Sequence, residues 1–150
     1  MSVHNEPALV QAFGHVGLST SDLERTMSLF RDVLGFEVTE VKEHSGEVLE
    51  KVVGIDSARI RIAYAHGHGV SVELLEYLSP AERRLSSARP CDAGHAHLAF
   101  TVRDLPALLE RLSGHGFVTH NPPQHVESAG KTIIYAYGPD SLVLELSEID

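Results

Sequence analysis

The sequence has one cysteine, no long apolar run and few basic side chains, and each shortage excludes a class of protein. Cys91 is the single cysteine and cannot form an internal disulfide, which fits a reducing compartment and predicts a cytoplasmic protein. No stretch approaches the ~18 consecutive apolar residues of a membrane-spanning helix. Residues 1–13 lack the basic and apolar regions of a secretory signal. We therefore expect no membrane partner.

The charge balance is acidic. Lys and Arg total 12 against 21 Asp and Glu, which gives a formal net charge of −9. Nucleic-acid binding requires clustered basic side chains that contact phosphates, so we expect no nucleic-acid partner. By contrast, ten histidines are many for 150 residues. Imidazoles serve as metal ligands and as acid–base groups, so the histidines are the part of the composition that points to chemistry.

The 150 residues, of which 43% are hydrophobic and 22% charged, predict one soluble globular domain over residues 1–150. In the first half, Ser21 and Glu24 form a capping box that starts a helix, and Gly35 suits the left-handed residue that ends it. The pattern predicts a strand at 13–20, a helix at 21–35, strands at 36–42, 58–65 and 70–78, and a hairpin turn at 66–69.

The second half repeats this order after a linker at 79–92 that contains two prolines. The expected elements are a strand at 95–102, a helix at 103–116 with Asp104 near its N-cap, strands at 117–120, 131–138 and 141–148, and a turn at 138–141. One copy of this unit cannot bury its sheet face alone, so the two copies should pack against each other. The sequence thus predicts an α+β fold with two βαβββ modules, at about 13–78 and 93–148.

Two histidines and two glutamates occupy matching places in the two halves. His15 and His97 stand the same number of residues before the Asp-Leu pair at the start of each helix, and Glu73 in SVELLE matches Glu145 in LVLELSE. Each half therefore contributes one imidazole from its first strand and one carboxylate from its last strand. A single such glutamate would be most simply a solvated residue on a half-exposed sheet, but four matched residues favour a shared site.

This set of side chains has the chemistry of a metal site. Imidazole nitrogens and carboxylate oxygens suit divalent Zn, Ni, Co, Mn or Fe, and the absence of thiolates argues against an iron–sulfur cluster or a structural zinc site. Each glutamate alternates with apolar neighbours along its strand, so its carboxylate faces solvent or a polar cavity rather than the core. The sequence therefore predicts His15, Glu73, His97 and Glu145 as metal ligands.

Four segments carry a resemblance to a known family: GHVGLSTSDLERTMSLFRDVLGFEV, VELLEYLSP, HLAFTVRDL and GKTIIYAYGPDSLVLELSE. Together they cover about residues 13–148 and resemble the vicinal oxygen chelate superfamily, which includes glyoxalase I, methylmalonyl-CoA epimerase, extradiol dioxygenases and fosfomycin- and bleomycin-resistance proteins. The resemblance implies paired modules that form a cup-shaped, barrel-like sheet around one divalent metal ion. It also implies a homodimer, and the sequence leaves open whether the modules pair within a chain or across a dimer.

Within that family, two His and two Glu resemble the ligands of the lyases and isomerases, such as glyoxalase I and methylmalonyl-CoA epimerase. This implies proton removal next to a metal-chelated carbonyl of a small substrate with vicinal oxygens. Glu73 and Glu145 are both candidates for the catalytic base, and the sequence does not rank them. The alternatives are a protein that binds a small antibiotic without turnover, and an Fe(II) extradiol dioxygenase, which would need only two His and one carboxylate.

The sequence holds weaker indications about substrate and surroundings. Basic residues for the phosphates of coenzyme A are scarce outside the linker, so a neutral or sugar-like hydroxy-ketone is as plausible a substrate as an acyl-CoA. Residues 47–53 form a short apolar-faced helix that either closes over the cup or caps the core. His95 would share a strand face with His97, and we expect it near the site rather than as a ligand. The other histidines are expected to be exposed: His4, His44, His66, His68, His115, His120 and His125.

Overall fold

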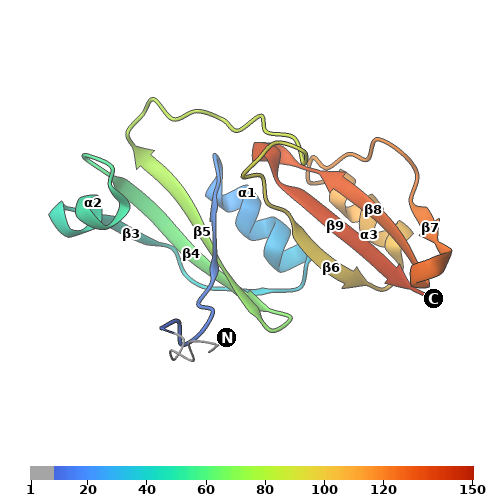
Figure 1. Ribbon diagram of the computed structural model, residues 1–150. Coiled ribbons are helices and arrows are strands. Elements are labelled where there is room, and N and C mark those ends of the chain that lie inside the picture. The colour runs from blue at the N-terminus through green and yellow to red at the C-terminus, as the bar shows by residue number, and fades with distance from the viewer. Residues whose placement is uncertain (1–8) are drawn as a thin grey trace, which may run out of the picture.

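Two modules with the same order of elements follow one another along the chain in the computed structural model, which describes residues 9–150. Figure 1 shows their two sheets on either side of helix α1, with the linker running across between them. The expected α+β class with successive βαβββ modules is confirmed, although the sheets remain two and do not close into a barrel. His4 lies outside the described residues.

The first module forms a five-stranded sheet in the order β1-β5-β4-β2, with β3 also paired to β4. β1 runs parallel to β5, and the other pairs are antiparallel. Its elements are β1 (Val16–Ser19), α1 (Leu23–Ser28), the π-helical turn η1 (Leu29–Val33), β2 (Glu37–Val38), β3 (Lys42–Ser45), α2 (Glu47–Val53), β4 (Arg59–Gly67) and β5 (Val70–Ser79).

The second module forms a four-stranded sheet in the order β6-β9-β8-β7. β6 is again parallel to the last strand, β9, as β1 is to β5. Its elements are β6 (Leu98–Val102), α3 (Leu105–Ser113), β7 (Gln124–Val126), the 3-10 turn η2 (Glu127–Ala129), β8 (Lys131–Tyr137), the 3-10 turn η3 (Pro139–Ser141) and β9 (Val143–Ile149).

The first helix begins one residue later than the predicted capping box. Asp22 is the N-cap, and its carboxylate accepts a hydrogen bond from the Arg25 N–H at 2.9 Å. Ser21 lies before the cap. Its N–H, which Glu24 would bind in the predicted capping box, donates instead to the carboxylate of Asp140 in the second module. The predicted capping box is therefore wrong. The predicted helix end holds, since Gly35 takes a positive φ of 73°.

Four strand predictions also differ from the structure. The segment 36–42 does not form one strand but divides between β2 and β3. The segment 117–120 contributes only an isolated bridge between Val118 and Tyr137, and the edge strand of the second sheet is β7 instead. The strands expected from residues 13 and 95 begin at Val16 and Leu98. Prolines at 122 and 123 separate the bridge from β7 and explain why no continuous strand forms there.

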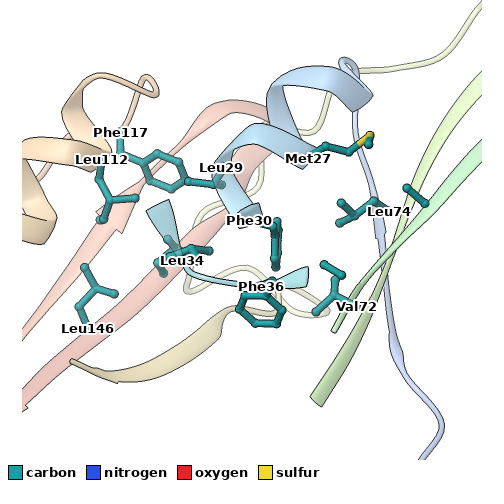
Figure 2. Packing of buried hydrophobic residues seen from close by; sticks show 14 of the residues in the cluster. Met27, Leu29, Phe30, Leu34, Phe36, Val72, Leu74, Leu112, Phe117 and Leu146 are labelled. Carbon is teal, nitrogen blue, oxygen red and sulfur yellow. The ribbon is translucent and has the colours of Figure 1, made fainter. Parts of the chain in front are cut away.

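One hydrophobic core joins the modules, as the repeat predicts. Figure 2 shows Phe30 between Val72 of the first sheet and the cluster around Leu112 and Phe117 of the second module. Phe30 and Leu112 are fully buried. This shared core fixes the two sheets relative to each other and leaves each sheet one face directed away from it. No helix in the described part of the chain has the length and apolar character needed to cross a bilayer.

Candidate metal centre

The first module brings His15 and Glu73 into direct contact. His15 lies immediately before β1, and Gly17 on β1 pairs with Glu73 on the parallel strand β5. The imidazole Nε2 lies 3.1 Å from the carboxylate Oε2. Val72 and Leu74 on either side of Glu73 are buried in the core, so the carboxylate extends from the opposite face of the sheet.

The second module repeats this arrangement with His97 and Glu145. His97 precedes β6, and Ala99 pairs with Glu145 on the parallel strand β9, the same offset as in the first module. His97 Nε2 lies 2.9 Å from Glu145 Oε2. The side chains of His97 and Glu145 are 35% and 23% exposed, so a small molecule can reach them. The matching offsets show that the sequence repeat corresponds to a repeat in space.

Each glutamate also faces a tyrosine that the sequence analysis did not single out. Tyr64 on β4 lies opposite Glu73, and its hydroxyl donates to Glu73 Oε1 at 2.6 Å. Tyr135 on β8 lies opposite Glu145. The tyrosines occur in the matching segments YAHG and YAYG, and this second repeat was the signal that could have identified them.

The pKa values of both tyrosines are raised, but the main cause differs between them. The hydrogen bond to Glu73 is the main reason that the pKa of Tyr64 lies above its ordinary value, followed by burial. Burial is the main cause of the raised pKa of Tyr135, followed by the negative charge of the nearby Glu145. Both hydroxyls therefore stay protonated at neutral pH, and that of Tyr64 donates to its carboxylate.

A single chain keeps the four predicted ligands as two separate pairs. Within residues 9–150, no group of three His, Cys, Asp or Glu side chains lies close enough together to hold a metal ion. Each pair nevertheless fits a metal. The N–O separations of 3.1 and 2.9 Å are those of a hydrogen bond or ion pair. They also match two neighbouring ligands at right angles, each ~2.1 Å from one ion, which lie ~3 Å apart.

His95 does not stand beside His97 on a strand, because both residues precede β6. Its Nε2 lies 3.1 Å from the carbonyl oxygen of Ser141, and its Nδ1 is buried without a hydrogen-bond partner among the described residues. His95 thus contacts the β8–β9 connection rather than Glu145. Its role in the structure is packing against that turn.

Other histidines have contacts beyond the exposure expected for them, and His115, expected to be exposed, is partly buried near Ser28. His66 stacks on the ring of Tyr64, with centroids 5.9 Å apart and planes 1° from parallel, and its Nδ1 lies 2.8 Å from Ser71 Oγ. His68 Nε2 lies 2.8 Å from the Leu34 carbonyl oxygen. Both side chains remain exposed, so that prediction holds, but His66 also supports a tyrosine of the candidate site.

Neither the short helix α2 nor the cavity between the modules adds to the candidate centre. α2 forms where predicted, but it buries no residue, and Val48 and Val52 are each 78% exposed, so it does not cap the core. The cavity, of about 700 Å³, is lined by residues that include Phe100, Val102 and Leu108. The four candidate ligands are not among the described residues that line it.

The fold and the matched pairs define a protein of two βαβββ modules with one His–Glu pair in each. The chain belongs to the glyoxalase/bleomycin resistance protein/dioxygenase superfamily, whose family model matches residues 12–146. A 2-epi-5-epi-valiolone epimerase from an Actinomyces species is 32% identical over 143 residues, which are 90% of this chain and 78% of the relative. The protein YwkD of Bacillus subtilis (strain 168) is 27% identical over 140 residues, 93% of this chain and 98% of that one.

Solved structures show the same fold. A glyoxalase family protein from Bacillus cereus superposes with a TM-score of 0.82 at 21% identity, and the match covers 98% of both chains. A mutant of the genomically encoded fosfomycin resistance protein FosX from Listeria monocytogenes superposes with a TM-score of 0.59 at 17% identity, over 92% of this chain and 90% of that one. That protein was crystallised with Mn(II) and 1S,2S-dihydroxypropylphosphonic acid.

Proposed function

We propose that the protein is a divalent-metal-dependent epimerase or lyase that removes a proton next to a carbonyl of a small substrate with vicinal oxygens. The observation that carries this proposal is the pair of matched contacts, His15–Glu73 and His97–Glu145. Both place an imidazole nitrogen and a carboxylate oxygen at the spacing of neighbouring metal ligands, on sheet faces opposite the core. The 32% identity to an epimerase supports the reaction class.

The four ligands come together in this proposal across a homodimer. The first module of one subunit faces the second module of its partner, so that one subunit supplies His15 and Glu73 and the other supplies His97 and Glu145. β1 and β6 support this arrangement, because each ends its sheet and pairs on one side only within the described part of the chain. Unpaired strand edges are natural surfaces for association, and a two-fold axis creates two equivalent sites per dimer.

A bound divalent ion would supply Lewis acidity, which polarises the substrate carbonyl and acidifies the neighbouring C–H. Glu73 and Glu145 are the groups of this chain that take up and return the proton, at their carboxylate oxygens. Epimerisation requires proton removal on one face of the carbon and delivery on the other. Two carboxylates contributed by two different modules suit this requirement, whereas a lyase step that only removes the proton would use one of them.

The charges around the site favour a neutral substrate. Arg83, Arg84 and Arg89, the candidates for binding coenzyme A phosphates, are exposed in the linker, and Arg89 is paired with Asp92. The sheet faces that carry the His–Glu pairs instead present neutral hydroxyl groups, such as that of Tyr135 opposite Glu145. Hydroxyl donors and acceptors match the oxygens of a polyhydroxylated ketone. We therefore propose a hydroxy-ketone in preference to an acyl-CoA.

Mixing two inactive variants tests the site. His15→Ala and His97→Ala each remove one ligand from every site, so neither variant alone should hold a stoichiometric metal ion. If the site is shared, a heterodimer of the two variants contains one site with all four ligands. Random assembly makes about half of the dimers heterodimeric, so the mixture should recover about a quarter of the wild-type metal content. No recovery after unfolding and refolding together would overturn the shared site.

Solvent deuterium uptake tests the reaction. Protein reconstituted with Mn(II) or Co(II) is incubated in deuterium oxide with neutral cyclic polyhydroxy-ketones, and with methylmalonyl-CoA as the charged comparison. We expect deuterium at the carbon next to the carbonyl of a hydroxy-ketone, faster than with metal-free protein. Oxygen consumption with a catechol would support a dioxygenase instead, and binding without exchange would support sequestration. Either result would overturn the proposed reaction.

A further inference from the structure

Tyr64 makes a short contact to one of the four candidate ligands. Its hydroxyl donates to Glu73 Oε1 at 2.6 Å, a length typical of a charge-assisted O–H···O⁻ hydrogen bond. The other oxygen of the same carboxylate, Oε2, faces His15 Nε2. The two oxygens of Glu73 are thus divided between a tyrosine and the imidazole.

The Tyr64 ring is itself held in place. The residue pairs with Glu73 across the β4–β5 hairpin, and its backbone N–H donates to Thr39 Oγ1 at 2.9 Å. His66 stacks on one side of the ring, and His15 meets it edge-on with centroids 5.8 Å apart. The hydroxyl therefore reaches Glu73 from a ring that strand pairing and two imidazoles orient.

The matching tyrosine of the second module is held differently. Tyr135 lies opposite Glu145, and its ring is tilted by 44° against His97 at 5.1 Å. The residue at the place of His66 is Tyr137, which packs on His120 rather than on Tyr135. Glu145 accepts a hydrogen bond from His97, and none joins it to the Tyr135 hydroxyl among the described residues. The two modules thus share the Tyr–Glu pairing but differ in how firmly it is made.

We propose that Tyr64 is a positioning residue of the metal site, which holds Glu73 Oε1 so that Oε2 alone is presented as the ligand beside His15. This inference rests on the proposed metal site. A ligand carboxylate whose second oxygen is hydrogen-bonded loses little rotational freedom on binding the ion, and such outer partners typically contribute ~10–100-fold to metal affinity. Tyr135 lies opposite Glu145 without such a hydrogen bond in the described part of the chain.

Tyr64→Phe tests the proposal, because it removes the hydroxyl and keeps the ring that packs between the imidazoles. We expect a ~10-fold or greater loss of Co(II) or Mn(II) affinity in isothermal titration. Tyr135→Phe is the matched variant and should lose less. Tyr77→Phe, a change on β5 opposite Ile60, is the control and should bind like the wild type. Equal affinity of Tyr64→Phe and wild type would overturn the proposal and leave the proposed function standing, whereas a wild type without metal would remove both.

Two further measurements separate positioning from a general structural effect. The infrared difference spectrum between metal-loaded and metal-free protein reports how a carboxylate binds the ion. In Tyr64→Phe, the frequency gap between the antisymmetric and symmetric carboxylate stretches should narrow, because Glu73 becomes free to bind through both oxygens. The Glu73→Gln variant assigns this band. A double-mutant cycle completes the test: if Tyr64 acts through Glu73, Tyr64→Phe should have no further effect on affinity in the Glu73→Gln background. Additive losses, or an unchanged band, would contradict positioning.

Discussion

The guanidinium of Arg25 lies 2.8 Å from the carboxylate of Asp140, and this contact joins the first helix to the β8–β9 connection of the other module. The same carboxylate oxygen accepts hydrogen bonds from Thr20 Oγ1 at 3.1 Å and from the Ser21 N–H at 2.9 Å. One side chain of the second module thus satisfies three donors at the start of α1, beside the shared core.

Replacing Asp140 by Asn should loosen this contact between the modules. Asn tolerates the left-handed backbone of residue 140, where φ is 59°, so the change removes charge without adding backbone strain. We expect a loss of ~1–2 kcal/mol in the free energy of unfolding, measured with urea. Asp32→Asn is the control, because Asp32 makes an exposed ion pair with the adjacent Arg31. Equal losses in the two variants would contradict the assignment.

The stability conferred by Asp140 should depend on pH. Burial alone would raise the pKa of Asp140, but hydrogen bonds from Ser21 and Thr20 and the charge of Arg25 lower it below its ordinary value of 3.8. A depressed pKa means that the stabilisation is complete above the ordinary value and is lost as the pH falls through the folded-state pKa. The stability difference between wild type and Asp140→Asn should therefore be constant at neutral pH and shrink below about pH 4. A difference that grows on acidification would refute this account.

Two neighbouring histidines should differ in what their loss affects. His97 faces Glu145 and is partly exposed, so His97→Ala should lower metal affinity by more than ~100-fold and leave the melting temperature nearly unchanged. His95 contacts the Ser141 carbonyl, so His95→Ala should lower the melting temperature and retain metal. Metal titration and calorimetry on both variants decide the matter. The reverse pattern would show that His95 is the ligand.

Much of the candidate site could be predicted because the repeat in the sequence corresponds to a repeat in space. His15 and His97 were found by their matching places, and their strands carry them to Glu73 and Glu145 with the same register offset. The separation of the four residues into two pairs could not be predicted. It depends on how the helices of both modules share one core around Phe30, and packing between distant segments leaves no local pattern in the sequence.

The tyrosines were missed for a different reason. Their segments, YAHG and YAYG, were interpreted only as strand and turn, although tyrosine and glycine recur there at matching places. The glycines have a structural cause. An added Cβ at Gly138 would lie 2.4 Å from the Phe117 ring, and one at Gly67 would lie 3.0 Å from the Phe36 ring. In both modules a phenylalanine of the core therefore packs on the strand backbone close behind the tyrosine.

Gly138→Ala should therefore destabilise the protein by steric overlap with a buried ring. Phe117 is 4% exposed and packs in the shared core, so we expect a loss of ~1–3 kcal/mol, the usual effect of overpacking. Gly14→Ala is the control, because no described atom outside its immediate neighbours lies within 4 Å of an added Cβ there. Chemical denaturation measures both. A Gly138→Ala protein as stable as Gly14→Ala would show that the Phe117 ring is not fixed against the strand.

Changing each glutamate to glutamine should distinguish the catalytic roles of Glu73 and Glu145. A glutamine amide oxygen still coordinates a metal, though more weakly, but it cannot accept the substrate proton. One of the two variants, Glu73→Gln or Glu145→Gln, should therefore keep much of its metal and lose deuterium exchange into a hydroxy-ketone, which identifies the base. In an epimerase that uses both carboxylates, the second variant should still exchange deuterium on one face but fail to invert the centre. Mass spectrometry follows the exchange, and chiral chromatography follows the inversion. Exchange at the wild-type rate in both variants would show that neither carboxylate is the base.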